Sequence, residues 1–333
     1  MQIRPIDLGS DDELRRFYDV AVAVRAFERP HFVPSTFADV AAAMRHDDPG
    51  ERQLHWGLWE GAELVGLVTA WLPLDDNVET MWGEVSVHPD QRRRGYGARG
   101  LVHLVEQAKT LGRSRIVGAA HYPPTRSIDH PYRLFLENNG FRLGNVQLSR
   151  LLELPVSDTL LDELAAEAAA AYRDNYRVDT FEEVPEPLLP SLCAVMNRVA
   201  TDAPTGEIEW EPESLTPTRY LWTVVKEAER GRRRLTSVAI DRDTGEVAAY
   251  TELILAPDIT RAHQSGTLVD ARHRGRRLGL AVKVANLQAV QERHADRVDI
   301  VTSNAAENPW MVAINDRLGF QPVEIEGEFY RQL

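Results

Sequence analysis

Cysteine and recognisable metal-ligand spacings are scarce in this chain. Cys193 is the only cysteine among 333 residues, so no disulfide can form within the chain. The histidines, among them His121, His130 and His294, show no spacing typical of a metal site. We therefore expect no metal ion, and the composition suits a reducing compartment.

Long apolar runs are also missing. Hydrophobic residues make up 43% of the chain but never form a run long enough to span a bilayer. No basic and then apolar leader follows Met1. We expect a cytoplasmic protein without a membrane partner.

The chain has fewer basic than acidic residues. The net charge is −13, which argues against nucleic acid as a main partner, because binding to a polyanion requires a positive face. A local basic site for one small anion remains compatible with this charge. The length of the chain favours two domains.

Two segments of the sequence follow one plan. Residues 85–97 and 267–279 both run from a short apolar strand through a polar turn and an arginine cluster to small residues and an apolar helix. Gly-Phe pairs ending at Phe141 and Phe320 follow them at nearly equal distances. The sequence therefore predicts two diverged copies of one domain.

Hydrophobic periodicity predicts a mixture of strands and helices in each copy. The expected strands cover residues 54–60, 63–72, 81–87, 115–119, 235–241, 247–255, 266–269 and 298–302. The expected helices cover residues 99–111, 132–139, 158–173, 280–293 and 309–318. Gly140 and Gly319 are the expected stops of the two short helices. The predicted class is α/β (α+β), with domains at 1–155 and 176–333 and a linking helix within 156–175.

An arginine cluster at the start of a helix points to an anion. That end of a helix already carries partial positive charge and free N–H groups. Nearby glycines let backbone amides approach a ligand closely, so strand, loop and helix together could hold a pyrophosphate. A solvated basic helix end is the simpler alternative for one copy, but its recurrence in an acidic protein favours the ligand site.

One competing motif is rejected. Residues 95–100 formally match the dinucleotide fingerprint G-x-G-x-x-G. However, several residues separate the strand from these glycines, no acidic residue follows at the required place, and the second copy lacks the pattern.

The loops resemble the GCN5-related N-acetyltransferase (GNAT) superfamily, whose signature is Q/R-x-x-G-x-G/A after a strand. RRRGYG at 92–97 satisfies it, while RGRRLG at 274–279 has Arg277 where the first glycine is usual. The tandem arrangement resembles the two-domain type that includes mycothiol synthase. The resemblance implies a GNAT-like mixed sheet flanked by helices in each domain, and acetyl-CoA as the cofactor.

The resemblance also assigns cofactor contacts. In the first copy these are Val85, Val87, Arg92, Arg93, Arg94, Gly95, Tyr96 and Gly97. In the second copy they are Leu268, Val269, Arg274, Gly275, Arg276, Arg277, Leu278, Gly279, Leu280, Asn304, Asn308 and Asn315. The first copy has no match to Asn304 or Asn308, so we expect the carboxyl-terminal half to be catalytic and the other half to hold a second cofactor or act as a scaffold.

Acetyl transfer to an amine requires a base, an oxyanion donor and an acid for the leaving thiolate. Glu252 and Glu84 are the candidate bases; Glu84 matches the family's usual position better, and Glu252 could instead be a charged residue on a solvent-facing strand surface. Val269, with Val87 as its counterpart, is the expected backbone donor. The tyrosine that the family commonly supplies as acid is missing from both copies, which leaves Tyr330 and Tyr250 as candidates.

The sequence thus favours an N-acetyltransferase that acetylates a primary amine of a small molecule. The alternative is a coenzyme A-binding sensor or scaffold in which one or both halves are silent. Segments 29–50 and 202–219 are expected to determine the acceptor. We expect a monomer or a weak homodimer.

Overall fold

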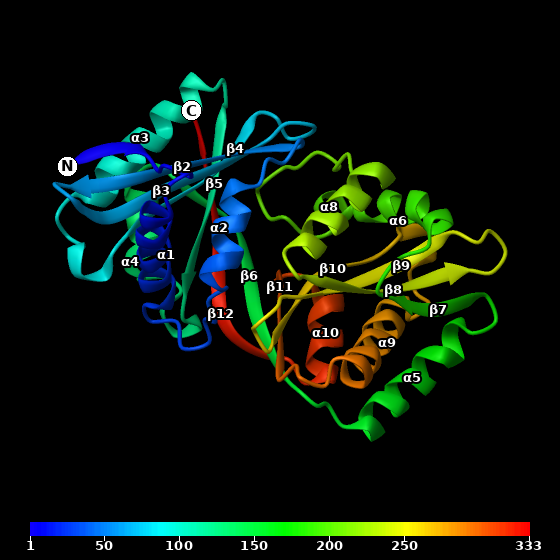
Figure 1. The fold of residues 1–333 in the computed structure, drawn as a ribbon. Coiled ribbons are helices and arrows are strands. Elements are labelled where there is room, and N and C mark those ends of the chain that lie inside the picture. The colour runs from blue at the N-terminus through cyan, green and yellow to red at the C-terminus, as the bar shows by residue number, and fades with distance from the viewer. The chain divides into compact units, whose positions relative to one another are not determined.

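The computed structural model describes residues 1–333 and divides into two compact units (Figure 1). Unit 1 comprises Met1–Val146, Gly206–Ile208 and Glu324–Leu333. Unit 2 comprises Gln147–Thr205 and Glu209–Val323. Among the helices, none combines the length and apolar character that crossing a membrane demands.

Unit 1 is a mixed sheet covered by helices. Its strands lie in the order β1 (Gln2–Pro5), β2 (Glu51–Glu60), β3 (Glu63–Pro73), β4 (Thr80–Val87), β5 (Arg115–Tyr122) and β12 (Gln321–Gln332). Its helices are α1 (Asp11–Ala26), α2 (Phe37–Arg45), α3 (Tyr96–Thr110) and α4 (Pro131–Asn138), with short 3-10 turns η1 (Pro89–Gln91) and η2 (Pro124–Arg126). Leu14 and Phe17 of α1 pack with Trp59 and Leu67 of the sheet in one buried cluster.

Unit 2 repeats this arrangement. Its strands lie in the order β6 (Arg142–Glu153), β11 (Asp299–Ala305), β10 (Arg261–Val269), β9 (Val247–Leu255), β8 (Arg233–Asp241) and β7 (Tyr176–Phe181). Its helices are α5 (Asp158–Tyr172), α6 (Leu189–Met196), α7 (Val199–Asp202), α8 (Pro217–Glu229), α9 (Leu278–Arg293) and α10 (Pro309–Leu318), with turns η3 (Glu186–Leu188) and η4 (Ala271–His273). The structure confirms the α/β class, with helices flanking mixed sheets.

Each unit receives its last strand from the other half of the chain. Residues 325–332 of β12 pair antiparallel with β5, so the carboxyl terminus completes the sheet of unit 1. Residues 147–153 of β6 pair antiparallel with β11, so a strand from the first half completes unit 2. The compact units are therefore discontinuous, whereas the domains expected from the sequence, at 1–155 and 176–333, are continuous segments. Strands β6 and β12 have no counterpart among the predicted strand ranges, and a local hydrophobic pattern does not show which sheet a strand joins.

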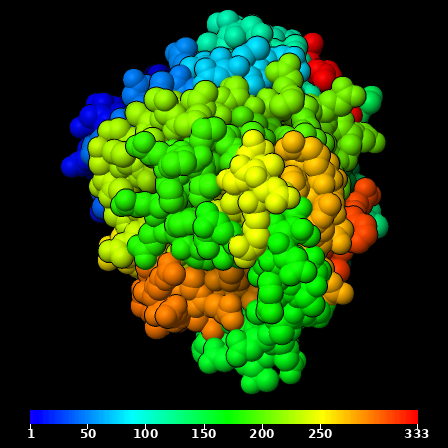
Figure 2. Space-filling model, turned by 90° about the vertical axis from the view of Figure 1, so that its right-hand side faces the viewer, coloured from blue at the N-terminus to red at the C-terminus, as the bar shows by residue number.

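The helix expected to link the copies is part of the core of unit 2. Leu161, Leu164 and Ala168 of α5 are buried in the same cluster as Leu280 and Leu287 of α9. Figure 1 shows α5 running beside α9, and green and orange atoms of these segments adjoin near the bottom of Figure 2. The apolar face of α5 therefore packs against α9.

Most predicted elements appear close to their expected bounds, and β9 and α10 match theirs. The strand expected at 266–269 begins already at Arg261, where Arg261 pairs with Asp299 at 2.6 Å. The helix expected at 99–111 begins at Tyr96, inside a glycine-rich stretch that lowers helix propensity. Helices α1, α2, α6, α7 and α8, the edge strands β1 and β7, and the strands β6 and β12 are not among the elements whose ranges were predicted.

Candidate functional site

The two arginine-rich loops have the same backbone construction. In unit 1, η1 is followed by Arg93 (φ 62°) and Gly95 (φ 82°), and α3 begins at Tyr96. In unit 2, η4 is followed by Gly275 (φ 81°) and Arg277 (φ 56°), and α9 begins at Leu278. Each loop thus places one glycine and one arginine at its two left-handed positions, in exchanged order. Arg277 therefore adopts the conformation that glycine adopts in the first copy.

One hydrogen bond ties each loop to the strand before it. Arg92 Nε donates to the carbonyl oxygen of Val87 at 3.2 Å, and Arg274 Nε donates to that of Val269 at 3.3 Å. Because the same bond forms in both copies, these two arginines shape the loops as well as supplying charge.

The helices after both loops begin without a side-chain cap. Gly95 and Arg277 occupy the N-cap positions of α3 and α9, and because glycine has no side chain and arginine has no side-chain acceptor, neither residue can cap the first turn. By contrast, Ser10, Thr36, Thr216 and Asn308 cap α1, α2, α8 and α10. The free N–H groups and the helix dipole make the starts of α3 and α9 suitable for a phosphate group.

The other arginines of the two loops differ in the partners that their side chains bind. Arg93 is exposed, and Arg94 bonds to Gln91. In unit 2, Arg276 lies over the ring of Tyr176, with 5.9 Å to the centroid. Arg277 forms an ion pair with Glu167 of α5, which also binds Arg317. The carboxylate of Glu167 therefore neutralises part of the charge of the second loop.

Two glycines occupy equivalent places in the first turns of α3 and α9. A Cβ atom on Gly97 would lie 3.5 Å from Phe135 of α4 and 3.8 Å from Val87. A Cβ atom on Gly279 would lie 3.3 Å from Ile314 of α10 and 3.5 Å from Val269. A larger side chain at either position must therefore project into the space between strand, loop and the last helix.

The central strands of each unit separate just before the loops. Parallel pairing joins β4 to β5 only at Thr80–Trp82, and β10 to β11 only at Arg261–His263. The predicted contact residues Val85, Val87, Leu268 and Val269 all lie beyond these pairs, on the diverging ends of β4 and β10.

Where β4 separates from β5, and β10 from β11, some backbone N–H groups point into the gap between the separated strands. His88 N donates to Val65 O and Asp270 N donates to Ala248 O, both toward the antiparallel neighbour. Because N–H groups alternate in direction along a strand, those of Val87 and Val269 point to the opposite, separated side. This arrangement can accept an extended ligand as an added strand.

Glu84 lies on the diverging part of β4 in unit 1. Its side chain is 37% exposed, accepts a bond from Ser86 Oγ at 2.6 Å and pairs with Arg25 at 3.2 Å. Burial opposes ionisation, but the guanidinium of Arg25 and the bond from Ser86 outweigh it and hold the pKa of Glu84 below its ordinary value. Glu84 is therefore a carboxylate at neutral pH.

Three ionisable residues that are not among the predicted site residues gather on the same face of unit 1. His121 Nδ1 of β5 lies 3.3 Å from a carboxylate oxygen of Glu324 of β12, and Arg29 binds Glu324 at 2.6 Å. The charge of His121 also lowers the pKa of Glu84. The alternation of Glu324, Glu326 and Glu328 was the available signal, since it places three carboxylates on one face of a strand.

Glu252 has a different environment in unit 2. Its side chain is 1% exposed and accepts bonds from Arg234 Nη1 at 2.7 Å and Thr236 Oγ1 at 3.0 Å. Tyr220 Oη lies 3.5 Å away, and burial together with the charge of Glu252 raises the pKa of that phenol. Glu252 is therefore enclosed by its hydrogen-bonding partners. It faces neither solvent nor an open cleft, so its position differs from both positions that the sequence left open.

The position in unit 2 that corresponds to Glu84 carries no side chain. Gly266 lies three residues before Val269, as Glu84 lies three before Val87. A Cβ atom on Gly266 would lie 2.1 Å from Tyr250 Oη. Tyr250 therefore fills the space that the carboxylate uses in unit 1, and burial raises the pKa of its phenol.

The remaining predicted residues are divided between the units. In unit 2, Asn315 Nδ2 donates to Asn304 Oδ1 at 3.0 Å, so these two asparagines meet, while Asn308 caps α10 through a 3.1 Å bond to Met311 N. Tyr330 pairs with Val117 in the sheet of unit 1 and donates to Glu207 at 3.2 Å. Tyr330, a candidate acid from the sequence, therefore lies in unit 1, whereas the other candidate, Tyr250, lies in unit 2.

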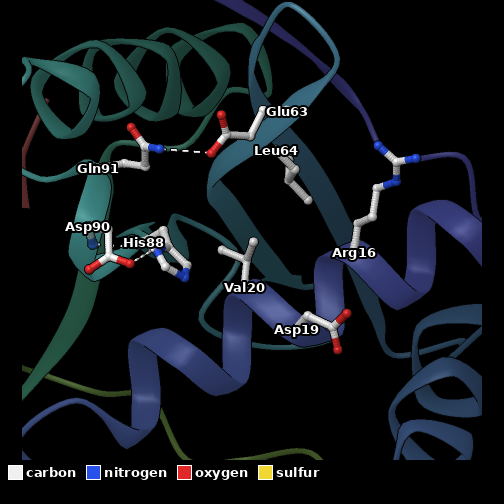
Figure 3. Close-up of a pocket in the computed structure, with 8 residues that line it drawn as sticks. All are labelled: Arg16, Asp19, Val20, Glu63, Leu64, His88, Asp90 and Gln91. Carbon is white, nitrogen blue, oxygen red and sulfur yellow. Dashed lines mark hydrogen bonds and ion pairs between the residues drawn. The ribbon is translucent and has the colours of Figure 1, made fainter.

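A pocket of about 390 Å³ adjoins the loop of unit 1 on the side of α1 (Figure 3). It is lined by Arg16, Asp19, Val20, Glu63, Leu64, His88, Asp90 and Gln91. Gln91 donates to Glu63 at 2.8 Å across its edge. With three carboxylates and one arginine in its lining, this pocket is unsuited to phosphate groups.

Comparison with protein families places a known domain on unit 1. Residues 20–130 match the model of the acetyltransferase (GNAT) family, which generally uses acetyl-CoA. The match supports acetyl transfer as the general class of reaction. A comparison with curated protein sequences gives no match.

Solved structures resemble the whole chain. A tandem GNAT protein from the clavulanic acid biosynthesis pathway shares 23% identity at a TM-score of 0.79, covering 99% of this chain and 98% of its own. A GCN5-related N-acetyltransferase from Sphaerobacter thermophilus shares 14% identity at a TM-score of 0.66, covering 99% and 95%. The chain therefore has the tandem GNAT fold.

Proposed function

Given the tandem GNAT fold and the two loops, we propose that the protein is an acetyl-CoA-dependent N-acetyltransferase that acetylates a primary amine of a small molecule. The observation that carries this proposal is Glu84, an ionised and partly exposed carboxylate beside the separated strands of unit 1.

The residues present fit coenzyme A. The uncapped starts of α3 and α9 and the left-handed loops would hold the pyrophosphate, and the open edges of β4 and β10 would receive the pantetheine arm. When bound, the cofactor supplies an acetyl group activated as a thioester.

Unit 1 offers the groups that the transfer requires. A substrate ammonium with a pKa of about 8 to 10 must lose its proton, and Glu84 would receive it, directly or through water. The N–H of Val87 points into the gap and would stabilise the developing oxyanion. His121, held by Glu324 on the same face, would return a proton to the leaving thiolate.

The choice of unit 1 reverses the expectation from the sequence, which favoured the carboxyl-terminal half because of its asparagines. Glu252 already accepts bonds from Arg234 and Thr236 and is almost fully buried, so it has no route to a substrate proton. Gly266 leaves unit 2 without a carboxylate at the position of Glu84. Unit 2 would then bind a second cofactor or act as a scaffold.

The test measures thiol release from acetyl-CoA across a panel of small primary amines. The Glu84→Gln variant should lower kcat by about 10²- to 10⁴-fold, the usual contribution of a general base, while acetyl-CoA affinity stays unchanged. Glu106→Gln changes an exposed glutamate on α3 and serves as the matched control. Equal turnover in the two variants would contradict the role of Glu84.

A coenzyme A sensor or scaffold is the second candidate, favoured by the buried Glu252 and the absence of a family-type tyrosine in both copies. It predicts cofactor binding without thiol release for every amine in the panel.

A further inference from the structure

Lysine is rare in this chain, and one of its lysines is buried. The sequence holds only Lys109, Lys226 and Lys283, against a combined total of 38 lysines and arginines. Lys109 is exposed and Lys226 pairs with Glu229 at 2.8 Å, as surface lysines usually do. Lys283 is 1% exposed within α9.

The amine of Lys283 has no polar partner. Its Nζ makes no hydrogen bond, and it lies 5.1 Å from the ring centroid of Phe320. Leaving a buried polar group unsatisfied is costly. Burial, followed by the charge of Arg150, lowers the pKa of Lys283 to about 7, so a large share of the amine is neutral at neutral pH.

Arg150 provides a second unsatisfied group in the same region. Its side chain is nearly buried, and its Nη1 donates to Asp316 at 2.6 Å and to Phe320 O at 3.4 Å. Its Nε has no partner. Lys283 and Arg150 thus both contact Phe320, one at its ring and one at its carbonyl oxygen, and Arg150 keeps one N–H donor unused.

The fold does not require a lysine at this position. Lys283 is the sixth residue of α9, and the sixth residue of α3 in the other unit is Leu101, which is buried in the ordinary way. Unit 2 therefore has a lysine at a position where unit 1 has a leucine.

We propose that Lys283 is a carbamylation site that takes up carbon dioxide. The lone pair of the neutral Nζ forms the new C–N bond, one C–O π pair moves onto oxygen, and the nitrogen releases one proton to water. The product is a carbamate anion, which the free Nε–H of Arg150 would bind. Carbon dioxide suits the site because it is small and apolar enough to enter a packed interior, unlike a thioester.

This modification satisfies both unpaired groups at once. A buried ion pair between the carbamate and Arg150 replaces an isolated amine and an unused donor. The inference does not depend on the proposed acetyl transfer, because neither Lys283 nor Arg150 has a part in that mechanism.

The experiment incubates the intact protein with ¹³C-labelled bicarbonate, traps carbamates with a trialkyloxonium reagent and maps the label by peptide mass spectrometry. The label is expected on Lys283 and should exceed that on Lys109 and Lys226 in the same molecule at least tenfold. Lys226→Arg should leave the Lys283 label unchanged, whereas Arg150→Met should reduce it several-fold.

The mapping within the wild-type protein tests the proposal even where Arg150→Met fails to fold. No label on Lys283, label spread equally over the three lysines, or an acetyl group on Lys283 in place of a carboxyl group would each overturn the proposal. Acetyltransferase activity is not the readout, so failure here and failure of the proposed function are separate results.

Discussion

At the scale of single residues, two glutamates illustrate how environment determines chemistry. Glu84 and Glu252 both lie on central strands, and the sequence identified both as possible bases. Arg25 and Ser86 keep Glu84 ionised at a partly exposed position, whereas Arg234 and Thr236 enclose Glu252. The carboxylate of Glu84 is accessible for proton exchange with a ligand. The carboxylate of Glu252 balances the positive charge of the buried Arg234.

The Glu252→Gln variant should therefore affect stability more than catalysis. The change removes the carboxylate that binds Arg234 and Thr236, but Glu227 still pairs with Arg234, so the loss should be about 1 to 3 kcal/mol. Urea unfolding should show this loss, while kcat of the folded fraction stays near that of the wild type. An unchanged midpoint of unfolding together with lost turnover would contradict this assignment.

Lys283 makes stability depend on pH. The pKa of its amine is about 7 in the folded protein against 10.5 ordinarily, so between these values only the unfolded state holds the proton. Stability should rise with pH across this window, and below pH 7 the folded state bears the full cost of about 5 kcal/mol.

The Lys283→Leu variant, which copies Leu101 of the other unit, should remove this dependence. Chemical denaturation at several pH values, in buffers freed of carbon dioxide, would measure it. A variant whose stability follows pH between 7 and 10 as steeply as the wild type would exclude Lys283 as the cause.

At the scale of elements, the loops before α3 and α9 are two versions of one backbone arrangement, which we propose as an anion site. Arg92 and Arg274 make the same bond to the preceding strand, and the left-handed positions are filled by arginine and glycine in opposite order. The sequence pattern located these loops because charge and glycine recur locally. The sequence pattern did not predict the backbone conformation of Arg277, because only the structure shows that this arginine adopts a positive φ.

Gly97→Leu and Gly279→Leu should each abolish cofactor binding in one unit. The side chain would extend past Phe135 in α4, or past Ile314 in α10, into the gap that receives the ligand. Calorimetric titration with acetyl-CoA should give two sites for the wild type and one for each variant. If either variant retained both sites, the corresponding loop would not be the phosphate site.

The pattern of elements was largely predictable, but the grouping of the charged residues was not. Strands β2, β3, β4, β8 and β9 follow from alternation that a buried sheet imposes locally. His121 and Glu324 meet only because β12 pairs with β5, and this pairing depends on a contact between distant parts of the chain. The same pairing places Tyr330, a candidate acid from the sequence, in the sheet of unit 1.

At the scale of the whole molecule, the exchanged strands make each unit depend on both halves of the chain. β12 supplies Glu324 to the charged face of unit 1, and β6 supplies Arg150 to the interior of unit 2. A fragment ending near residue 155 should lack a sheet strand of unit 1.

Removing residues 324–333 should therefore destabilise unit 1, although they lie at the far end of the chain from its other strands. Phe329 of β12 is fully buried, and its loss alone corresponds to about 3 to 5 kcal/mol. Hydrogen exchange should show reduced protection in β5 and unchanged protection in β8 and β9. Unchanged protection of β5 would contradict the strand exchange.

The central claim is that unit 1 transfers acetyl groups with Glu84 as the base. Its most direct test supplies isotopically labelled acetyl-CoA and an amine panel to the wild type, Glu84→Gln and Glu252→Gln, and detects the acetylated amine by mass spectrometry. We predict labelled product from the wild type and from folded Glu252→Gln, and almost none from Glu84→Gln. Product from Glu84→Gln together with none from folded Glu252→Gln would move the chemistry to unit 2 and contradict the account.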